Sequence, residues 1–240
     1  MVPFSFAGHE FLLTAGRALY WPRESALLVA DLHLEKASFF ARHGQPLPPY
    51  DSRETLERVA LAIRESGARR VFTLGDNFHD SSGARRFERH AAGMLAALTR
   101  ATDWVWITGN HDPAMEAPFG GALAAELEIA GMVLRHRAQA GERRPELSGH
   151  FHPRVEITAH HRRVRRPCVV MGTGPESGGR MILPAFGALT GGMDAAAPAI
   201  RAAMQPAHVI DAVVPVAGRL ARFALWRQPV APIASDPLRA

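Results

Sequence analysis

Hydrophobic residues in the first half of the chain gather in short continuous runs that stop abruptly at small or polar residues. The clearest runs lie in residues 25–34, 70–79 and 103–112, and they are typical of strands buried on both faces. Between them, residues 51–67 and 83–100 repeat apolar positions at helical spacing. Strand, helix, strand, helix, strand is the rhythm of an α/β fold with short connections, so we predict that fold class.

Past residue 120 the pattern changes. Residues 122–129 are predicted to form a helix, and most later apolar segments are short and predict strands of a second sheet. These predicted strands are residues 131–136, 146–152, 155–161, 168–172, 180–186, 209–216 and 219–226. Residues 9–22 predict a small hairpin at the start of the chain. Because no linker divides the sequence, residues 1–227 are predicted as one domain and the proline-rich residues 228–240 as a flexible C-terminal tail.

Composition places the chain among ordinary globular proteins, with 47% hydrophobic and 21% charged residues over 240 positions. No apolar run reaches the roughly 18 residues that span a bilayer. The N-terminus lacks the basic start and apolar core of a signal peptide. Cys168 is the only cysteine, so no internal disulfide can form. We therefore predict a cytoplasmic protein without a membrane association.

The formal net charge of +5 and an isoelectric point of about 10.5 favour a polyanionic partner such as nucleic acid. Lys36 is the only lysine, so the positive charge is almost all arginine, which a GC-rich genome also produces. Arg42, the helix residues Arg85 and Arg86, and the arginine run at 162–166 are candidate contacts for substrate phosphate, since arginine binds phosphate bidentately. The alternative is that these arginines form only solvated surfaces.

Five predicted strand ends carry side chains that bind metal ions. Residues i and i+2 of a strand point to the same side, so Asp31 with His33, and His150 with His152, can each supply two groups to one place. The full set is Asp31, His33, Asp76, Asn110, His111, His136, His150 and His152. Carboxylates, imidazoles and an amide without a thiolate suit Mn²⁺, Fe or Zn²⁺ in a mixed nitrogen and oxygen site. The set exceeds the needs of one ion and fits two ions that share a bridging carboxylate.

Four motifs follow one another along the chain: Asp31-x-His33, Gly75-Asp76, Gly109-Asn110-His111-Asp112 and Gly149-His150-Phe151-His152. In this order they resemble the motif set of the calcineurin-like metallophosphoesterases, over roughly residues 25–155. Further stretches resemble, more narrowly, the bacterial ligase-associated DNA damage response endonuclease family. These stretches are Val29-Ala-Asp-Leu-His-Leu-Glu-Lys, Leu74-Gly-Asp-Asn-Phe-His, Gly149-His-Phe-His-Pro, Arg166-Pro-Cys, Leu183-Pro-Ala-Phe-Gly and Thr190-Gly-Gly.

The resemblance implies a four-layered αββα sandwich with a binuclear metal centre between its two sheets. One ion would be held by Asp31, His33, Asp76 and His152, and the other by Asp76, Asn110, His136 and His150. Asp76 would bridge the two. The two divalent ions are expected to be Mn²⁺, with Fe or Zn²⁺ as alternatives. The assignment of His136 rests on a single histidine at a strand end.

In such a centre two cations deprotonate a bridging water, and the hydroxide attacks phosphorus in line with the leaving oxygen. His111 is not needed as a ligand and is expected to protonate the leaving alkoxide as a general acid. Asp112 is expected to orient the imidazole of His111 and to raise its pKa. His79 is left with two roles, a contact with substrate phosphate or packing behind the ligands.

Three functions fit these residues. The first is a DNA phosphodiesterase or endonuclease in repair, in functional association with a DNA ligase and other repair proteins. The second is a phosphatase or phosphodiesterase for nucleotides or other small phosphate esters. The third is a metal-binding repair scaffold without catalysis, against which His111 and Asp112 argue, because a scaffold needs no general acid. The sequence makes no prediction of the oligomeric state.

Overall fold

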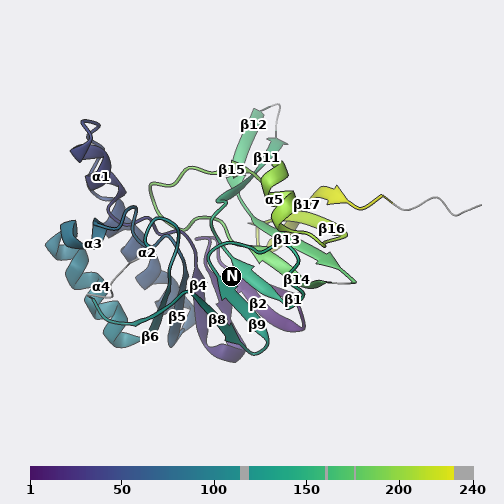
Figure 1. The fold of residues 1–240 in the computed structure, drawn as a ribbon, viewed down its shortest axis with the longest axis horizontal. Coiled ribbons are helices and arrows are strands. Elements are labelled where there is room, and N and C mark those ends of the chain that lie inside the picture. The colour runs from purple at the N-terminus through teal and green to yellow at the C-terminus, as the bar shows by residue number, and fades with distance from the viewer. Residues whose placement is uncertain (114–118, 160–161, 176, 230–240) are drawn as a thin grey trace, which may run out of the picture.

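The structure is a computed structural model that describes residues 1–113, 119–159, 162–175 and 177–229. Its first half is formed by β1 (Val2–Phe6), β2 (His9–Leu13), β3 (Leu19–Trp21), η1 (Pro22–Glu24), β4 (Ala26–Val29), α1 (Lys36–Arg42), α2 (Asp51–Ser66), β5 (Arg70–Leu74), α3 (Gly83–Arg86), α4 (Arg89–Ala101), β6 (Asp103–Ile107) and β7 (Ala122–Ala124). Its second half is formed by β8 (Glu126–Ile129), β9 (Met132–Arg135), β10 (Glu146–Ser148), β11 (Pro153–Ala159), β12 (Arg162–Pro167), β13 (Val169–Gly174), β14 (Ser177–Ile182), β15 (Met193–Asp194), α5 (Pro198–Ala203), β16 (Val209–Val216) and β17 (Arg219–Arg227). Figure 1 shows their arrangement.

The first sheet has the strand order β1-β2-β3-β4-β5-β6-β7. Strands β1 to β4 pair antiparallel, and β4 to β7 pair parallel. Strand β4 is buried on both faces: Leu27 and Val29 pack toward the helices, while Leu28 packs toward the second sheet. This double burial explains the continuous apolar runs, and the parallel pairing of β4, β5 and β6 brings their carboxyl ends to one edge.

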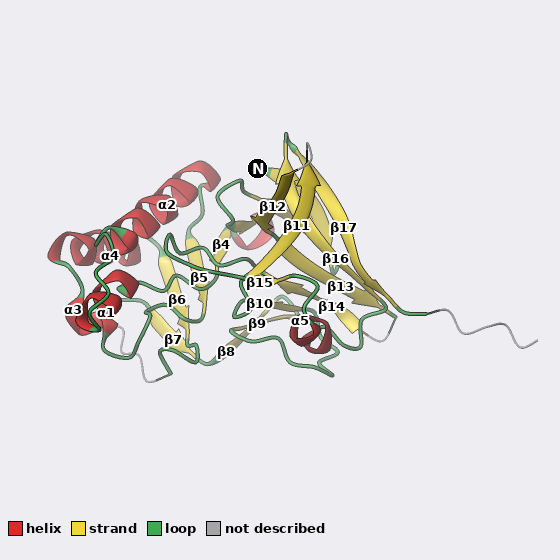
Figure 2. Ribbon diagram, turned by 90° about the horizontal axis from the view of Figure 1, so that it is seen from above, coloured by secondary structure: helices red, strands yellow, loops and turns green. Residues whose placement is uncertain are grey.

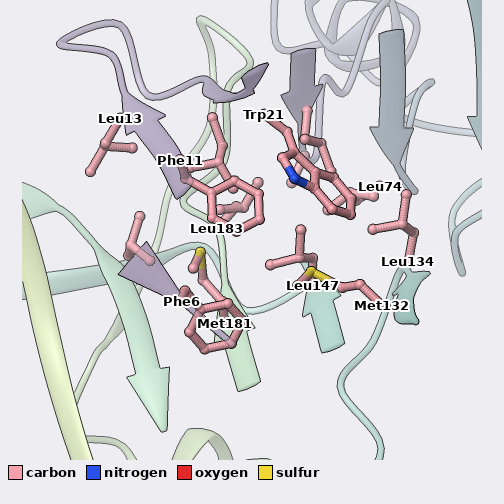
Figure 3. Close-up of a cluster of buried hydrophobic side chains, with 14 of the residues drawn as sticks. Phe6, Phe11, Leu13, Trp21, Leu74, Met132, Leu134, Leu147, Met181 and Leu183 are labelled. Carbon is pink, nitrogen blue, oxygen red and sulfur yellow. The ribbon is translucent and has the colours of Figure 1, made fainter. Parts of the chain in front are cut away.

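The second sheet has the order β17-β16-β13-β14-β10-β9-β8, and β9, β10 and β14 run parallel within it. The two sheets pack face to face around one apolar cluster (Figure 3). Phe11, Trp21 and Leu74 enter this cluster from the first sheet, and Leu134 and Leu147 from the second. Burial of each such side chain contributes about 1.5–3 kcal/mol, so this layer holds the sheets together.

Each sheet also has an outer covering (Figure 2). Helices α2 and α4 cover the first sheet, where Leu56 and Leu95 pack in one cluster with Trp106. Helix α5 and a small third sheet, of order β12-β11-β15, cover the second. The α/β sandwich with αββα layering predicted from the sequence is therefore confirmed, with a short helix and a small sheet together as the fourth layer.

The predicted helix at 122–129 is wrong, because this segment forms the short strands β7 and β8. Strand β7 adds to the edge of the first sheet and β8 to the edge of the second. In β8 the side chains alternate: Leu127 and Ile129 pack on the core, while the exposed Glu126 and Glu128 form ion pairs with arginines. An alternation with a period of two is hard to recognise over only four residues. The alanines that precede Glu126 favour a helix, so the segment was predicted as helical.

Two further boundaries differ from the prediction. The helix expected over 83–100 is interrupted, because Phe87 and Glu88 are extended between α3 and α4. The carboxylate of Glu88 caps α4 by accepting from the N–H groups of His90 and Ala91. The strand predicted at 155–161 belongs to the third sheet as β11, not to the second, and residues 160–161 lie outside the described residues.

The single-domain division of residues 1–227 remains a prediction. Most of the predicted tail, residues 230–240, lies outside the described residues. Among the helices that are described, none is both long and apolar enough to cross a membrane.

Candidate metal centre

The predicted ligands follow the carboxyl ends of strands from both large sheets. Asp31 and His33 follow β4, Asp76 follows β5, Asn110 follows β6, His136 follows β9, and His150 and His152 follow β10. Since β4, β5 and β6 run parallel, as do β9 and β10, these ends meet where the two sheets face each other. The N–H of His150 donates to both carboxylate oxygens of Asp31, at 3.1 and 2.9 Å, and so joins the two sheets at this edge.

One group of ligand atoms comes from Asp31, His33, Asp76 and His152, all within 4.8 Å of one another. His33 Nε2 lies 3.2 Å from His152 Nε2 and 3.7 Å from Asp76 Oδ2. His152 Nε2 lies 3.6 Å from Asp31 Oδ1. Two carboxylates and two imidazoles therefore converge on a single position.

A second group contains Asp76, His136 and His150. His136 Nε2 lies 3.5 Å from Asp76 Oδ1 and 3.0 Å from His150 Nδ1. Asn110 Oδ1 completes the group, 2.9 Å from the same His136 nitrogen. The other ring nitrogen of His136 donates to the carbonyl oxygen of Leu74 at 3.1 Å, which directs the Nε2 lone pair into the group. Asp76 belongs to both groups.

These separations test whether divalent ions fit. Carboxylate–imidazole distances of 3.5–3.7 Å are too long for hydrogen bonds. Two atoms that each lie about 2.1 Å from one ion are roughly 3.0–3.6 Å apart for bond angles of about 90–120°. The spacing and the mixture of oxygen and nitrogen donors therefore fit two ions that share Asp76.

Two histidines of these groups, His33 and His150, have lowered pKa values, which favour the neutral form that binds metal ions. Burial, followed by the neighbouring His152, lowers the pKa of His33 from 6.5 to about 2. Burial, followed by the charge of His136, also lowers the pKa of His150. Asp31 and Asp76 are almost fully buried, at 0% and 2% exposure. Buried carboxylates are costly without a cation, so the site favours positive charge from outside the chain.

The backbone at the ligands is unusual. Five of them have left-handed conformations, with φ of +54° at Asp31, +45° at His33, +46° at Asp76, +75° at His150 and +47° at His152. Residues other than glycine rarely adopt this region, and each instance costs on the order of 1–3 kcal/mol. Such strain persists where it aims side chains for function, so it is independent support for a functional site.

Two glycines allow the loops to approach the ligands. A Cβ at Gly109 would lie 2.2 Å from Asp76 Oδ1, and a Cβ at Gly149 would lie 2.6 Å from Asp31 Oδ2. Both distances are far below van der Waals contact. The glycines in the Gly-Asn-His-Asp and Gly-His-Phe-His motifs are therefore needed for close packing against the carboxylates.

His111 lies at the solvent side of the first group, with its side chain 41% exposed. Its Nδ1 donates to the carbonyl oxygen of His79 at 2.9 Å, because a carbonyl can only accept. This fixes Nε2 toward the centre, 3.9 Å from Asp76 Oδ2. The imidazole is therefore held beside the ligands with one nitrogen available for proton transfer.

The role expected for Asp112 as the partner of His111 is wrong. Its buried carboxylate accepts three backbone N–H groups instead, from Gly109 at 2.8 Å, Asn77 at 2.7 Å and Phe78 at 3.1 Å. These bonds lower the pKa of Asp112, but burial acts more strongly and raises it. Asp112 therefore joins the loops after β5 and β6, which carry Asp76 and Asn110. Sequence reasoning missed the carbonyl oxygen of His79 because a main-chain atom leaves no residue-type signal.

His79 packs among aromatic rings near the centre. Its ring stacks on His111 at 5.3 Å and on Phe40 at 5.9 Å, and its Nδ1 lies 3.4 Å from that of His33. Burial, followed by the charge of Lys36, lowers the pKa of His79 to about 4. These contacts favour the packing role of His79 over a direct contact with substrate phosphate.

The predicted arginine contacts differ from one another. Arg42 in α1 and Arg85 in α3 are exposed. Arg86 forms two bonds to the carboxylate of Asp80, at 3.0 and 2.9 Å, and donates to Ser38. Because its guanidinium is already held, the geometry argues against Arg86 as a phosphate contact.

Comparison with known proteins agrees with this geometry. The model of the calcineurin-like phosphoesterase family matches residues 25–169. Among solved structures, the chain is similar to the Pseudomonas putida nuclease MPE, with 28% sequence identity and a TM-score of 0.68. That similarity covers 92% of this chain and 98% of the other. No curated protein sequence matches the chain.

Proposed function

The chain belongs to the calcineurin-like phosphoesterase family, and from this premise we propose that it is a two-metal phosphodiesterase that cleaves DNA. The observation that carries the proposal is the pair of ligand groups that share Asp76 at the carboxyl ends of strands from both sheets. Two adjacent cations are the arrangement that hydrolysis of a phosphodiester by in-line displacement requires.

The residues assigned to the ions are those predicted from the sequence. We assign Asp31, His33, Asp76 and His152 to one ion, and Asp76, Asn110, His136 and His150 to the other. When bound, two divalent ions, for which we propose Mn²⁺, supply an activated water and neutralise the phosphoryl oxygens. Imidazole and carboxylate ligands without thiolate suit this ion.

His111 is proposed as the general acid. In-line attack on a DNA phosphodiester expels a sugar alkoxide, which must take up a proton as the bond to phosphorus breaks. The protonated imidazole of His111 can give it the Nε2 proton, while the Nδ1–H stays bonded to His79. After transfer, His111 is neutral and takes a proton from solvent, to which it is open.

Replacement of His111 tests this role. We expect His111→Ala to slow cleavage of DNA about 10²–10⁴-fold, because its leaving group needs the proton. Hydrolysis of bis-p-nitrophenyl phosphate should fall far less, since nitrophenolate leaves without protonation. His90→Ala, at an exposed histidine of α4, is the matched control. An equal loss on both substrates, with both metals still bound, would refute the acid role.

DNA as the substrate has three supports. The chain is basic, and its motifs resemble those of ligase-associated repair endonucleases. The similar Pseudomonas putida protein is a nuclease. From these we propose a cytoplasmic role in DNA repair, in functional association with a DNA ligase.

The substrate class is tested by one panel on Mn²⁺-loaded protein. We expect cleavage of DNA and of bis-p-nitrophenyl phosphate, slow hydrolysis of p-nitrophenyl phosphate, and loss of all activity with chelator. Preference for the monoester, without DNA cleavage, would indicate a phosphatase of small esters. Metal binding without any hydrolysis would indicate a scaffold.

A further inference from the structure

The positive charge of the chain is concentrated in one hairpin. Strands β11 and β12, within residues 153–167, contain five arginines and one glutamate. The rest of the chain has 23 basic and 22 acidic side chains, against a net charge of +5 for the whole. A general bias toward arginine would spread this excess along the chain, so the hairpin needs its own explanation.

The hairpin directly follows a residue of the metal centre along the chain. Strand β11 begins one residue after His152, and the N–H of Met193 in β15 donates to the carbonyl oxygen of His152 at 3.2 Å. In Figure 1, β11 and β12 stand at the upper edge of the molecule. At about 3.3 Å per residue, the seven residues of β11 reach roughly 20 Å from that ligand.

Most of these arginines have no acidic partner. Arg162, Arg163, Arg165 and Arg166 are all exposed on β12, which is the outer strand of its sheet. Glu156 forms an ion pair with Arg163, at 2.6 Å from its Nε. Within the described residues, no carboxylate lies within ion-pair distance of the other three.

The hairpin is attached by its apolar residues. Val155 is 5% exposed and packs with Cys168, Val170 and α5, and Ile157 packs against the same cluster. The arginines therefore lie on a hairpin that is packed against the rest of the protein, and not on a free loop. Exposed cations on a fixed strand suit a ligand that carries many anionic groups.

Protection of a sheet edge is a competing explanation, since charged residues on edge strands prevent unwanted pairing. That role works with charges of either sign, as at the β8 edge of the second sheet. There Glu126 and Glu128 of β8 pair with Arg135 and Arg144. Like charges side by side on β12 repel one another, so the uniform sign favours an anionic partner.

We propose that the β11–β12 hairpin is a nucleic-acid-binding arm whose arginines contact phosphates of the strand that enters the metal centre. The proposal rests on the proposed function, and it specifies the surface on which the DNA substrate lies. Nucleotides of one strand rise about 3.4 Å each in B-form DNA, so an arm of roughly 20 Å spans about six of them. Phosphate contacts of this kind position the substrate without reading its sequence.

The salt dependence of DNA binding measures these contacts. The wild type is to be compared with the triple variant Arg162→Ala, Arg165→Ala, Arg166→Ala, using labelled phosphorothioate DNA that resists cleavage and Mn²⁺-loaded protein. Each lost phosphate contact lowers the slope of log K against log salt by about 0.7–0.9, so the triple variant should lose about two units and bind on the order of a hundredfold more weakly at 0.1 M salt. Activity on bis-p-nitrophenyl phosphate should be unchanged.

The matched control removes three exposed arginines from elsewhere: Arg64→Ala, Arg69→Ala and Arg100→Ala. They precede the amino ends of β5 and β6, at the edge of the first sheet opposite the metal centre. This variant has the same net charge and should keep the wild-type slope. If both triple variants lose the same slope, or the hairpin variant loses none, the arm is refuted while DNA cleavage stands.

Two outcomes separate this proposal from its premise. A wild type that hydrolyses the small diester but binds no DNA refutes the DNA substrate and the arm together. If the triple hairpin variant fails to fold, the single variants Arg162→Ala and Arg165→Ala should each lower the slope by about 0.7–0.9. Unchanged slopes in both single variants would overturn the arm.

Discussion

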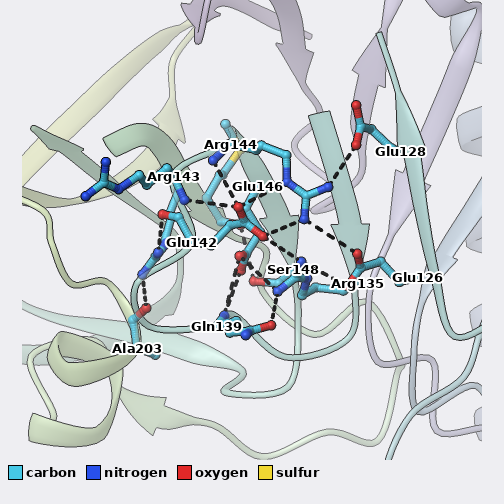
Figure 4. Close-up of polar contacts among 12 residues, drawn as sticks. Glu126, Glu128, Arg135, Gln139, Glu142, Arg143, Arg144, Glu146, Ser148 and Ala203 are labelled. Atoms are coloured by element: carbon cyan, nitrogen blue, oxygen red, sulfur yellow. Dashed lines mark hydrogen bonds and ion pairs between the residues drawn. The ribbon is translucent and has the colours of Figure 1, made fainter. Parts of the chain in front are cut away.

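Two clusters of polar and charged side chains, each mostly buried, are built on opposite rules. The first is the metal centre. The second, which we call the Arg–Glu cluster, contains Arg135, Glu142, Arg144 and Glu146, which Figure 4 labels, together with Arg180, which donates to the carbonyl oxygen of Glu142. In the Arg–Glu cluster, charges of opposite sign meet: Arg135 lies 3.0 Å from Glu142 and 3.7 Å from Glu146.

The terminal nitrogens of a further cation of the Arg–Glu cluster, Arg180, donate to main-chain carbonyl oxygens. Arg180 is fully buried and donates to the carbonyl oxygens of Ala203 at 2.7 Å, Glu142 at 2.6 Å and Gln205. In the metal centre, by contrast, no lysine or arginine of the described residues lies within 4 Å of Asp31 or Asp76. The carboxylates there face imidazoles at distances of 3.5–3.7 Å, which are too long for hydrogen bonds.

This difference distinguishes a structural cluster from a ligand site. A cluster in which cations and carboxylates of the chain meet needs no charge from outside, even though the Nε atoms of Arg135 and Arg180 lack a hydrogen-bond partner among the described residues. Converging lone pairs, by contrast, need a cation. The two are also connected. Arg135 directly precedes His136, and the N–H of Gln139 donates to Glu146 at 3.1 Å, so the Arg–Glu cluster fixes the loop that follows a proposed ligand.

The largest effect is expected from the residue shared by both ligand groups. Asp76→Ala removes a donor from each ion, and loss of even an outer-shell partner typically costs 10–100-fold. We therefore expect hydrolysis of bis-p-nitrophenyl phosphate to fall more than about hundredfold. Elemental analysis should show fewer than two bound metal ions per chain.

The counterpart in the Arg–Glu cluster is Glu142→Gln. It removes one carboxylate charge from a group that we assign no metal, so metal content and activity should stay at wild-type values. If Asp76→Ala retains two ions and activity, the assignment of Asp76 as the shared ligand is wrong. If Glu142→Gln loses metal, the distinction between the two clusters fails.

A second effect concerns stability rather than rate. Because only the folded chain presents the ligands together, ions at about a hundred times Kd should stabilise it by about 2.7 kcal/mol per site. For a chain of this size, each kcal/mol raises Tm by about 2–4 °C, so two bound Mn²⁺ ions should raise Tm by roughly 10–20 °C over chelator-treated protein, and one ion by about half as much. Differential scanning calorimetry measures the shift. An equal shift in Asp76→Ala would mean that the ions bind elsewhere.

The metal centre was more predictable from the sequence than the fold around it. Parallel buried strands end at one edge, so polar residues at strand ends, such as Asp31 and Asp76, could be placed together without a structure. The structure brings together all seven candidate ligands, from Asp31 to His152. The chemistry of the residue types and their order were sufficient for this step.

Features that depend on main-chain geometry could not be read in the same way. The partner of His111 is a carbonyl oxygen, and the carboxylate of Asp112 is taken up by backbone N–H groups. Helix α1 begins at Lys36 after three left-handed residues, for which the sequence gives no signal. Residues 122–129 were wrongly predicted because tertiary pairing at two sheet edges overrides helix propensity.

The smallest effect tests whether the Arg–Glu cluster is fully ionic. Burial raises the pKa of Glu146 from 4.5 to about 7, although Arg135 and Arg180 lie beside it. The folded chain then holds this proton more tightly than the unfolded chain. Its contribution to stability is complete below about pH 4.5 and is lost as pH rises to about 7.

Glu146→Gln cannot titrate, so the free energy of unfolding of the wild type should fall relative to the variant between about pH 4.5 and 7, by at most a few kcal/mol. Urea denaturation across this range measures the difference, with Glu128→Gln, an exposed carboxylate paired with Arg144, as the control. Parallel curves for wild type and Glu146→Gln would mean that Glu146 stays ionised beside its arginines. The two clusters would then differ completely in their counter-charges. Every carboxylate of the Arg–Glu cluster would be ionised beside an arginine of the chain, whereas the carboxylates of the metal centre have no such partner within the described part of the chain.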